Sequence, residues 1–334
     1  MVAVAGAVLA SCATATVTVT PPRVTGLPAI SISVPLSSVA CTTNNSCVAL
    51  GTSVLDVSTT SVGEYRSIKG RWAALSVPSA DPSTFLASSS CWNDGCLFVG
   101  SQTSGDLVWR YDEGTHAVTT ASAPPSASGV DAVSCYTSLT CAIVDSSRAG
   151  ARFLLSVDGG TTWSSPVILG VPAQDTVTSL SCTSELDCIA SFLNASNGVA
   201  VYVTGDGGAT WTPRATFSTL PWSALTSLTC AGRKCLGMAK LPTGWRIVRT
   251  KNFGMSWSKV DSLPGSNLTM ACTSLERCVV GGMEGSSSAW LATLKSNSLT
   301  PVKLTYVPSP IADVACGSSI CAAVGVTTVM ALRP

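Results

Sequence analysis

The sequence has few charged side chains and almost no histidine. Lys, Arg, Asp and Glu make up 11% of its 334 residues, the net charge is +1, and His116 is the single histidine. No basic run is present, which argues against nucleic acid as a partner. Segments with helical periodicity are missing, and no stretch after residue 12 is long enough to cross a bilayer. Because 46% of the residues are apolar, most of the chain can be buried in a compact all-β structure.

A cysteine pair is repeated seven times instead, with first members 42 to 50 residues apart. The pairs are Cys41/Cys47, Cys91/Cys96, Cys135/Cys141, Cys182/Cys188, Cys230/Cys235, Cys272/Cys278 and Cys316/Cys321. A period in the forties that recurs this often indicates one supersecondary unit tiled around an axis or along a solenoid.

The residues around each pair predict the unit. Alternating stretches such as Asp131–Cys135 end at the first cysteine, and others such as Cys47–Gly51 and Cys278–Gly282 start at the second. Both predict β-strands, joined by the polar loop between the two cysteines. A third strand follows, as at Ala151–Leu155, and a fourth runs from a tryptophan such as Trp211 towards a proline. Four short strands in about 45 residues are typical of a propeller blade. We therefore predict an all-β, seven-bladed β-propeller of four-stranded antiparallel blades.

A second motif lies between the third and fourth strands of three consecutive units. Its copies are Ser156-Val-Asp158-Gly-Gly160-Thr-Thr162-Trp163, Thr204-Gly-Asp206-Gly-Gly208-Ala-Thr210-Trp211 and Thr250-Lys-Asn252-Phe-Gly254-Met-Ser256-Trp257. Asp or Asn bonds its own backbone, Gly supplies positive φ, and Trp packs on the sheet.

This motif resembles the Asp box, or BNR repeat, of bacterial sialidases and related propellers, which include a photosystem II assembly factor. In that family the Asp boxes are structural and lie away from the active site, so the resemblance implies a fold and no catalytic activity. The structural positions that it implies here are Asp158, Gly160, Trp163, Asp206, Gly208, Trp211, Asn252, Gly254 and Trp257.

The last unit ends after three strands, at Thr328–Leu332. Several fourth strands end in Val-Pro or Leu-Pro, and Ile30–Pro35 has the same ending with no unit before it. We predict that residues 29–35 pair as the outer strand of the last blade. This N-terminal strand would close the ring and hide open sheet edges.

The N-terminus predicts export. Val2–Ala10 is small and apolar, and Leu9-Ala-Ser-Cys12 matches the bacterial lipobox, in which cleavage precedes a lipid-modified cysteine. We expect a signal peptide at 1–11, a lipidated Cys12 opening a tether at 12–28, and a propeller at 29–334. The protein would be anchored to the outer side of the bacterial cell membrane, or secreted, with the lipid as its only membrane contact. The alternatives are a plain signal peptide and a free cysteine in the tail. No Lys or Arg precedes the apolar run, which counts against an export signal unless the true start lies upstream.

Export and the cysteine pairs support each other, because disulfides persist in oxidising compartments. Facing residues of a hairpin lie at a suitable separation, so we predict one hairpin disulfide in each blade. The alternative, zinc held by two pairs, is disfavoured because the pairs are distributed one per blade. No metal or cofactor is predicted.

Sialidase chemistry would need three arginines, a Tyr/Glu nucleophile pair and an aspartate acid/base. Residues of these types on the predicted loops opposite the Asp boxes are Arg148, Arg152, Arg246, Tyr306, Glu284 and Asp131. The Arg-Ile-Pro motif of sialidases is absent, and the acidic residues of the loops are scattered, whereas glycoside hydrolysis needs two carboxylates at a defined separation.

Three functions are therefore ranked. A non-catalytic protein-interaction or assembly scaffold at the cell envelope comes first, with a protein or glycan partner and a monomeric state. A carbohydrate-binding propeller comes second, suggested by Trp92, Trp222 and Trp245 as loop aromatics. A sialidase-type glycoside hydrolase comes third, since it rests on fold analogy alone.

Overall fold

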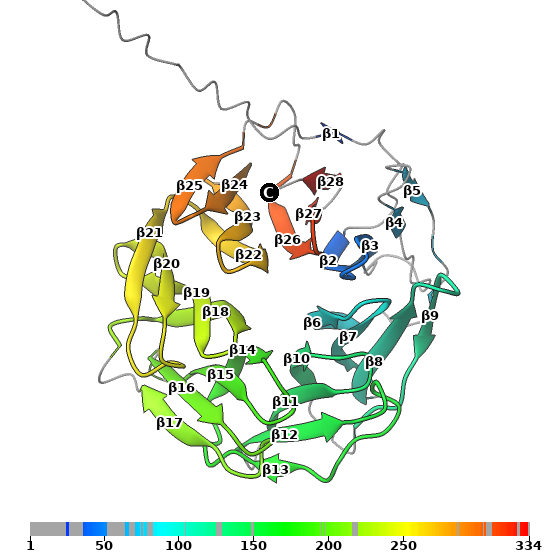
Figure 1. Ribbon diagram of the computed structural model, residues 1–334, viewed down its shortest axis with the longest axis vertical. Helices are drawn as coiled ribbons and strands as arrows, with labels where there is room; N and C mark the ends of the chain where they lie inside the picture. The colour runs from blue at the N-terminus through cyan, green and yellow to red at the C-terminus, as the bar shows by residue number, and fades with distance from the viewer. Residues whose placement is uncertain are drawn as a thin grey trace, which may run out of the picture.

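The protein is a ring of β-sheets around a central channel, seen end-on in the computed structural model of Figure 1. The structure describes residues 25–26, 36–51, 64–66, 71–73, 75, 77–78, 83–103, 105–124, 129–147, 150–194, 196, 198–215, 220–285, 287–302, 304, 309–325 and 328–332. All its elements are strands, and no helix in these segments is long and apolar enough to cross a membrane.

The described strands form seven four-stranded antiparallel sheets, numbered here as blades in chain order. Blades 1 and 2 contain β2 (Leu36–Cys41), β3 (Ser46–Gly51), β4 (Glu64–Arg66), β5 (Arg71–Ala73), β6 (Phe85–Cys91), β7 (Gly95–Gln102), β8 (Gly105–Asp112) and β9 (Ala117–Thr120). Blades 3 and 4 contain β10 (Val130–Cys135), β11 (Cys141–Ser147), β12 (Gly150–Ser156), β13 (Val167–Ile168), β14 (Thr176–Cys182), β15 (Cys188–Leu193), β16 (Val199–Thr204) and β17 (Thr212–Ala215). Blades 5 and 6 contain β18 (Ala224–Ala231), β19 (Lys234–Leu241), β20 (Gly244–Thr250), β21 (Ser258–Leu263), β22 (Ser266–Ser274), β23 (Arg277–Glu284), β24 (Ser288–Lys295) and β25 (Ser298–Pro301). Blade 7 contains β26 (Ile311–Cys316), β27 (Cys321–Gly325), β28 (Thr328–Leu332) and β1 (Thr25–Gly26).

The hydrophobic core lies between the blades. Seven clusters of buried residues each join two neighbouring blades, and the cluster of Leu36, Trp72 and Val324 joins blade 7 to blade 1. The second strand of a blade, such as β3 or β15, is therefore buried on both faces, because each blade has a neighbour on either side. This explains how a chain with so few charges folds as a ring without one large central core.

Each blade contains one disulfide, between the cysteines that were paired from the sequence. The two cysteines of a pair face each other near the end of the first strand and the start of the second, as in Cys182↔Cys188. Their Cα atoms are 3.9 to 4.1 Å apart. The predictions of an all-β propeller, four-stranded antiparallel blades and a hairpin disulfide in each blade are confirmed.

The predicted start of the second strand is wrong in four blades. Cys47, Cys96, Cys235 and Cys278 were expected to open this strand, but it begins one residue earlier, at Ser46, Gly95, Lys234 and Arg277 respectively. The preceding residue already pairs with a neighbouring strand, as in Ser46↔Arg66, Gly95↔Asp112 and Ala231↔Lys234. In blades 1 and 2 this extra residue pairs with the third strand. In blades 5 and 6 the ladder of the hairpin itself continues past the disulfide, at Ala231↔Lys234 and Ser274↔Arg277, and shortens the loop.

The second cysteine of each pair is also a core residue, which its predicted place at the start of a strand did not indicate. The side chains with 0% exposure are Cys47, Cys96, Cys141, Cys235, Cys278 and Cys321, and Cys188 is 2% exposed. Cys47, Cys96 and Cys235 belong to three different clusters between blades. The second strand lies inside its sheet and is covered by a neighbouring blade, so these sulfurs have a structural role and do not form an accessible site.

The closing strand differs from the predicted one. The outer strand of blade 7 is β1, with Thr25 opposite Ala331 and Gly26 opposite Met330. It lies in the segment predicted as a tether, whereas residues 29–35 lie outside the described residues. The chain must next cross from the outer to the inner edge of a blade, about 14 Å for three strand spacings. That crossing needs about four residues or more, and a strand ending at Pro35 leaves none before β2 begins at Leu36.

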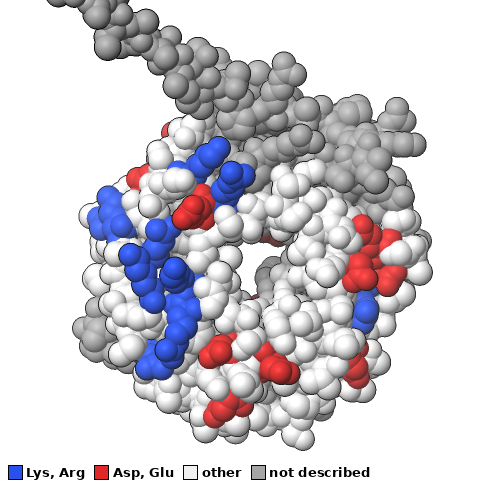
Figure 2. Space-filling view, in the orientation of Figure 1, with Lys and Arg blue, Asp and Glu red and all other residues white. Residues whose placement is uncertain are grey.

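One end of the ring carries the disulfide hairpins, which join first to second strands, and the turns that join third to fourth strands. We call this end the hairpin face; Figure 2 shows it towards the viewer. In five blades a backbone N–H of the turn donates to a carbonyl of the hairpin, for example Gly159 to Leu139 at 2.7 Å and Gly207 to Leu186 at 3.0 Å. These bonds hold hairpin and turn together as one surface.

The three motif turns share one hydrogen-bond pattern. Asp158 Oδ1 accepts the Thr162 N–H at 2.8 Å, and Ser156 Oγ accepts the Gly160 N–H at 2.7 Å. Asp206 and Asn252 repeat the pattern in the next two blades. Hydrogen bonds from Thr162 lower the pKa of Asp158 to about 2, and those from Thr210 do the same for Asp206. Both turns therefore keep a negative charge across the physiological pH range.

Candidate functional site

The residues predicted for sialidase chemistry are spread over the ring. Arg152 lies on β12 of blade 3, Arg246 on β20 of blade 5 and Glu284 at the end of β23 in blade 6. Asp131 is on β10 and lines the central channel. Arg148 and Tyr306 lie outside the described residues. No hydrogen bond or ion pair joins any two of the four described candidates.

Arg152 already has a carboxylate partner inside the protein. Its Nε and a terminal nitrogen bond the two oxygens of Asp145 at 2.9 and 2.8 Å, and Asp145 is fully buried. This bidentate pair satisfies a buried charge that would otherwise be costly. The guanidinium of Arg152 is therefore already bonded within the protein and has a structural role. Asp131, for its part, accepts the Ser146 N–H at 2.8 Å, and burial raises the pKa of its carboxyl.

The aromatic residues suggested for glycan binding are mostly in the core. Trp92 is 4% exposed and Trp222 is 9% exposed, each within a cluster between blades. Trp245 is half-buried against the cluster between blades 5 and 6. Their expected role as exposed sugar platforms is wrong for Trp92 and Trp222, because blades need large side chains to fill the widening gap between sheets.

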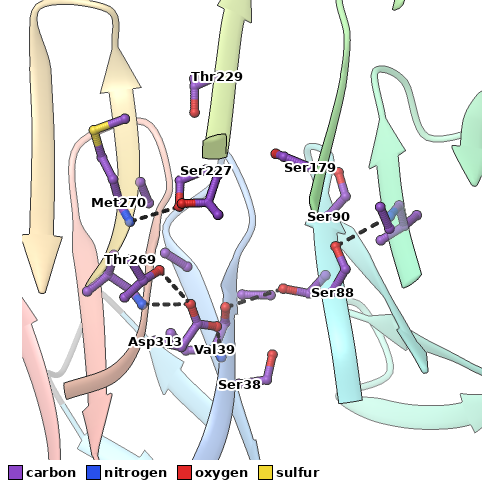
Figure 3. A pocket seen from close by; sticks show the side chains of 18 of the residues that line it. Ser38, Val39, Ser88, Ser90, Ser179, Ser227, Thr229, Thr269, Met270 and Asp313 are labelled. Atoms are coloured by element: carbon purple, nitrogen blue, oxygen red, sulfur yellow. Dashed lines mark hydrogen bonds between the residues drawn. The ribbon is translucent and has the colours of Figure 1, made fainter. Parts of the chain in front are cut away.

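The central channel holds a cavity of about 590 Å³ lined by the inner strands β2, β6, β10, β14, β18, β22 and β26. Hydroxyl groups dominate its wall, and many are bonded to the inner strand of the next blade (Figure 3). Ser88 accepts the Val133 N–H at 3.3 Å, Ser179 the Leu228 N–H at 2.9 Å, and Ser227 the Met270 N–H at 3.3 Å. Contacts of this kind cross all seven junctions between blades.

These hydroxyls occupy an equivalent place in their blades. Ser88, Ser179 and Ser227 each stand three residues before the first cysteine, at a register shift of the inner strand. Ser88 and Ser179 directly follow the shift, and Ser227 lies within it. An inner strand is a sheet edge with unpaired backbone N–H groups, and the neighbouring serine satisfies one of them. The main role of these channel hydroxyls is therefore to join the inner strands of neighbouring blades by hydrogen bonds.

Asp313 takes the serine position in blade 7, at the junction where the ring closes. Its Oδ2 accepts the Val39 N–H of blade 1 at 2.9 Å, and its Oδ1 accepts the Thr269 hydroxyl of blade 6 at 3.2 Å (Figure 3). One side chain thus links three blades. Burial raises the pKa of this carboxyl to about 6, against the lowering effect of its hydrogen bonds.

The hairpin face carries most of the exposed large apolar side chains. Seven such side chains are found among the described residues, and five lie on this face: Tyr136, Leu139, Val157, Leu186 and Met255. Val157 is 66% exposed and Met255 is 63% exposed, although each belongs to a rigidly bonded turn. Exposed apolar groups concentrated on one face are typical of a protein-docking surface.

Charge on the hairpin face is divided into two sectors (Figure 2). The basic sector covers blades 5 and 6 and consists of Arg233, Lys234, Lys251, Lys259, Arg277 and Lys295, all exposed. The acidic sector covers blades 2 to 4 and consists of Asp94, Asp112, Glu113, Asp158, Glu185, Asp187 and Asp206. Glu276 in the first sector and Arg110 in the second are exceptions. Among the described residues the sole ion pair is Arg152–Asp145, so the cations of the basic sector have no carboxylate partner there.

The sequence did not single out this surface, because the two sectors come from hairpins and turns that are far apart along the chain. The channel hydroxyls that join the blades could have been found from the sequence, because Ser or Thr recurs three residues before the first cysteine of a pair. Within the described segments, no group of three or more His, Cys, Asp or Glu side chains is placed to hold a metal ion.

Comparison with known proteins identifies the fold and no family. No family model matches the chain, and no curated protein matches it. Among solved structures, YCF48 bound to D1 peptide is similar at 12% identity and a TM-score of 0.64, covering 94% of this chain and 95% of that one. YCF48 from Cyanidioschyzon merolae gives 14% identity and 0.64, covering 94% and 99%.

A hydrolase is similar to the same degree. The GH74 xyloglucanase from Xanthomonas campestris gives 11% identity and a TM-score of 0.66, and the match covers 94% of this chain but 54% of the enzyme. Because a peptide-bound protein and an enzyme resemble the chain equally, the likeness is one of fold alone. The chain is a β-propeller whose activity must be argued from its own surface.

Proposed function

We propose that this protein is a non-catalytic scaffold that binds another protein at the cell envelope through its hairpin face. The hairpin face carries the proposal, because it combines exposed apolar side chains with unpaired charges on hairpins held by hydrogen bonds. A surface that is already ordered loses little conformational entropy on binding. The peptide named with YCF48 is in keeping with a propeller that binds protein segments.

The two alternatives have less support. A sialidase needs its arginines free for a substrate carboxylate, and the Arg152 guanidinium is bonded to Asp145. A glycan binder needs exposed aromatic faces, and Trp92 and Trp222 are buried. The turn motif fits the structural Asp box, which supports the fold and adds no catalytic group.

We also propose that the protein works outside the cytoplasm as a lipoprotein. The lipobox ending in Cys12 supports export and anchoring, and this segment lies outside the described residues. Seven disulfides in one chain support an oxidising compartment. The same argument applies to a secreted form that lacks the anchor.

The test is cross-linking capture of the full chain from gently solubilised membranes of its host. Capture by the wild type should be stoichiometric, and Leu186→Ser with Met255→Ser should abolish it, because both side chains lie on the hairpin face. Ile168→Ser, at an exposed apolar residue of outer strand β13, is the matched control and should leave capture intact. Equal capture by all three proteins, or specific retention of a glycan instead, would contradict the proposal. In the same fractionation Cys12→Ala should move the chain out of the membrane fraction.

A further inference from the structure

We infer that the first partner of the hairpin face is a second copy of this chain, bound face to face about a two-fold axis. This inference rests on the proposed function, since it takes the hairpin face as a docking surface. The inference goes beyond the proposed function because it uses the distribution of charge to identify the partner as a second copy of the chain.

In Figure 2 the basic sector lies to the left of the channel, and the acidic sector lies to its right and below it. A two-fold axis in the plane of this face, running between the sectors, turns a second copy over and exchanges its two sides. The basic sector of each protomer then meets the acidic sector of the other. Such an interface is isologous, so every attractive contact occurs twice. A single segregated face is thus complementary to itself.

The exposed apolar side chains fit the same arrangement. Leu139, Val157 and Leu186 lie on blades 3 and 4 within the acidic sector, and Met255 lies on blade 5 within the basic sector. The two-fold operation places Met255 of one copy over the acidic sector of the other, where the three aliphatic side chains are exposed. Methionine adapts its shape to irregular apolar surfaces, which suits it to this position.

Other occupants match half of the surface. A bilayer of anionic lipid would attract Lys234 and Lys251 but would also meet Asp94 and Glu185 across a face of this breadth. An acidic polypeptide would fill the basic sector and leave the acidic sector and its apolar side chains uncovered. A second copy neutralises both sectors at once, and therefore the observations favour it.

Sedimentation of the full-length chain tests the inference, with Cys12→Ala introduced to prevent lipidation. We expect a dimer at about 50 μM protein and low salt, and dissociation as salt rises to about 0.5 M, because screening shortens the range of the charges. Lys234→Glu with Lys251→Glu should weaken dimerisation about tenfold or more, and so should Asp94→Lys with Glu185→Lys. All four side chains are exposed, so these substitutions leave the packing between blades unchanged.

Mixing the two variants provides the decisive measurement. In the mixed pair the new glutamates face the new lysines, while the two unchanged sectors face each other, so an equimolar mixture should recover the dimer. Lys240→Glu, an exposed cation near the opposite end of β19, is the control and should dimerise like the wild type. A wild type that stays monomeric at low salt, or variants that fail to complement each other, would overturn the inference. If the monomer still captures a different protein through Leu186 and Met255, the proposed function stands and only the second copy is excluded.

Discussion

Asp313 is the residue on which the closing junction depends. It replaces the serine found at this position in other blades, and it receives hydrogen bonds from Val39, Thr269 and Val314. A serine oxygen could not reach both neighbouring blades, whereas the two oxygens of a carboxylate can. The same surroundings disfavour its charge, and burial raises its pKa to about 6.

This raised pKa predicts a particular dependence of stability on pH. An unfolded aspartate has a pKa near 3.9, so the folded state retains the Asp313 proton between about pH 4 and pH 6. The stabilisation is fully present below about pH 4 and is lost as pH rises through about 6. Two pKa units correspond to about 3 kcal/mol of unfolding free energy.

Asp313→Asn isolates this contribution, because an amide does not titrate. Urea unfolding at about pH 4.5 and pH 7.5 should show the wild type losing more stability than the variant as pH rises. The variant should also lose a constant amount of unfolding free energy at both pH values. Its NH₂ group must face either the Val39 N–H or the Val314 N–H, and neither of these can accept a hydrogen bond. Parallel curves for the two proteins would contradict the assignment.

At the scale of single residues the sequence predicted structural roles better than exposure. The turn residues Asp158 and Asp206 are where the motif placed them. Trp92 and Trp222 were assigned to exposed loops, yet they fill gaps between blades. Burial between two blades depends on a neighbour about 45 residues away, and local patterns do not contain that information.

The motif turn is an element that joins one blade to the preceding one. Trp211 of blade 4 packs edge-on against Phe153 of blade 3, with ring centroids 5.3 Å apart. Gly208 brings the turn backbone against the same phenylalanine, where an added Cβ would overlap the ring. Glycine is therefore required at this position for contact as well as for its φ of +89°.

Gly208→Ala should consequently destabilise the fold by about 2 to 4 kcal/mol, combining overpacking with backbone strain. Gly170→Ala is the matched control, because Gly170 has a φ of +71° and no atom within 4 Å of an added Cβ. The Gly170→Ala variant should lose about 1 kcal/mol of unfolding free energy, from backbone strain alone. Thermal or urea unfolding measures both, and equal losses would show that Phe153 does not set the requirement.

The closing strand shows why element boundaries were harder to predict than elements. A Val-Pro ending placed the strand at residues 29–35, but the strand is Thr25–Gly26. The length of the crossing to β2 decides the boundary, and that length is a property of the sheet. Strands that contain a cysteine were predicted to within two residues at the disulfide, because the bond fixes their register, as in Cys135↔Cys141.

For the whole molecule, the repeated cysteine pair was the strongest predictor of the fold. Each pair marks one four-stranded sheet of the structure, as the repeat predicted. The docking surface was not predictable in this way. It is assembled from hairpins and turns of several blades, and each contributes only one or two charged or apolar side chains. The sequence order separates residues that the ring places together.

Stability of the whole ring should depend on the disulfides collectively. Each closes a loop of five or six residues in separation, which is worth about 2 kcal/mol on the chain-entropy account. Replacing Cys182 and Cys188 by serine should lower the melting temperature by a few degrees, about what that free energy implies for a chain of this size. Reducing all seven should lower it far more.

Free thiols must be counted before that melt, because buried sulfurs such as those of Cys47, Cys96 and Cys235 meet a reductant only when a blade opens. The chain is therefore reduced in denaturant, and the denaturant is then removed with the reductant still present. A melting temperature that stays unchanged when every thiol is free would show that the disulfides do not stabilise the ring.

Among the residues that the structure describes, every disulfide lies within a blade and none links two blades. In covalent connectivity the molecule is therefore an open chain with seven small loops, although its shape is a closed ring. A single proteolytic cut in a crossover, such as the one between Leu263 and Ser266, leaves two polypeptides that only packing and hydrogen bonds hold together. Denaturant alone would separate the two fragments, with every sulfur still oxidised.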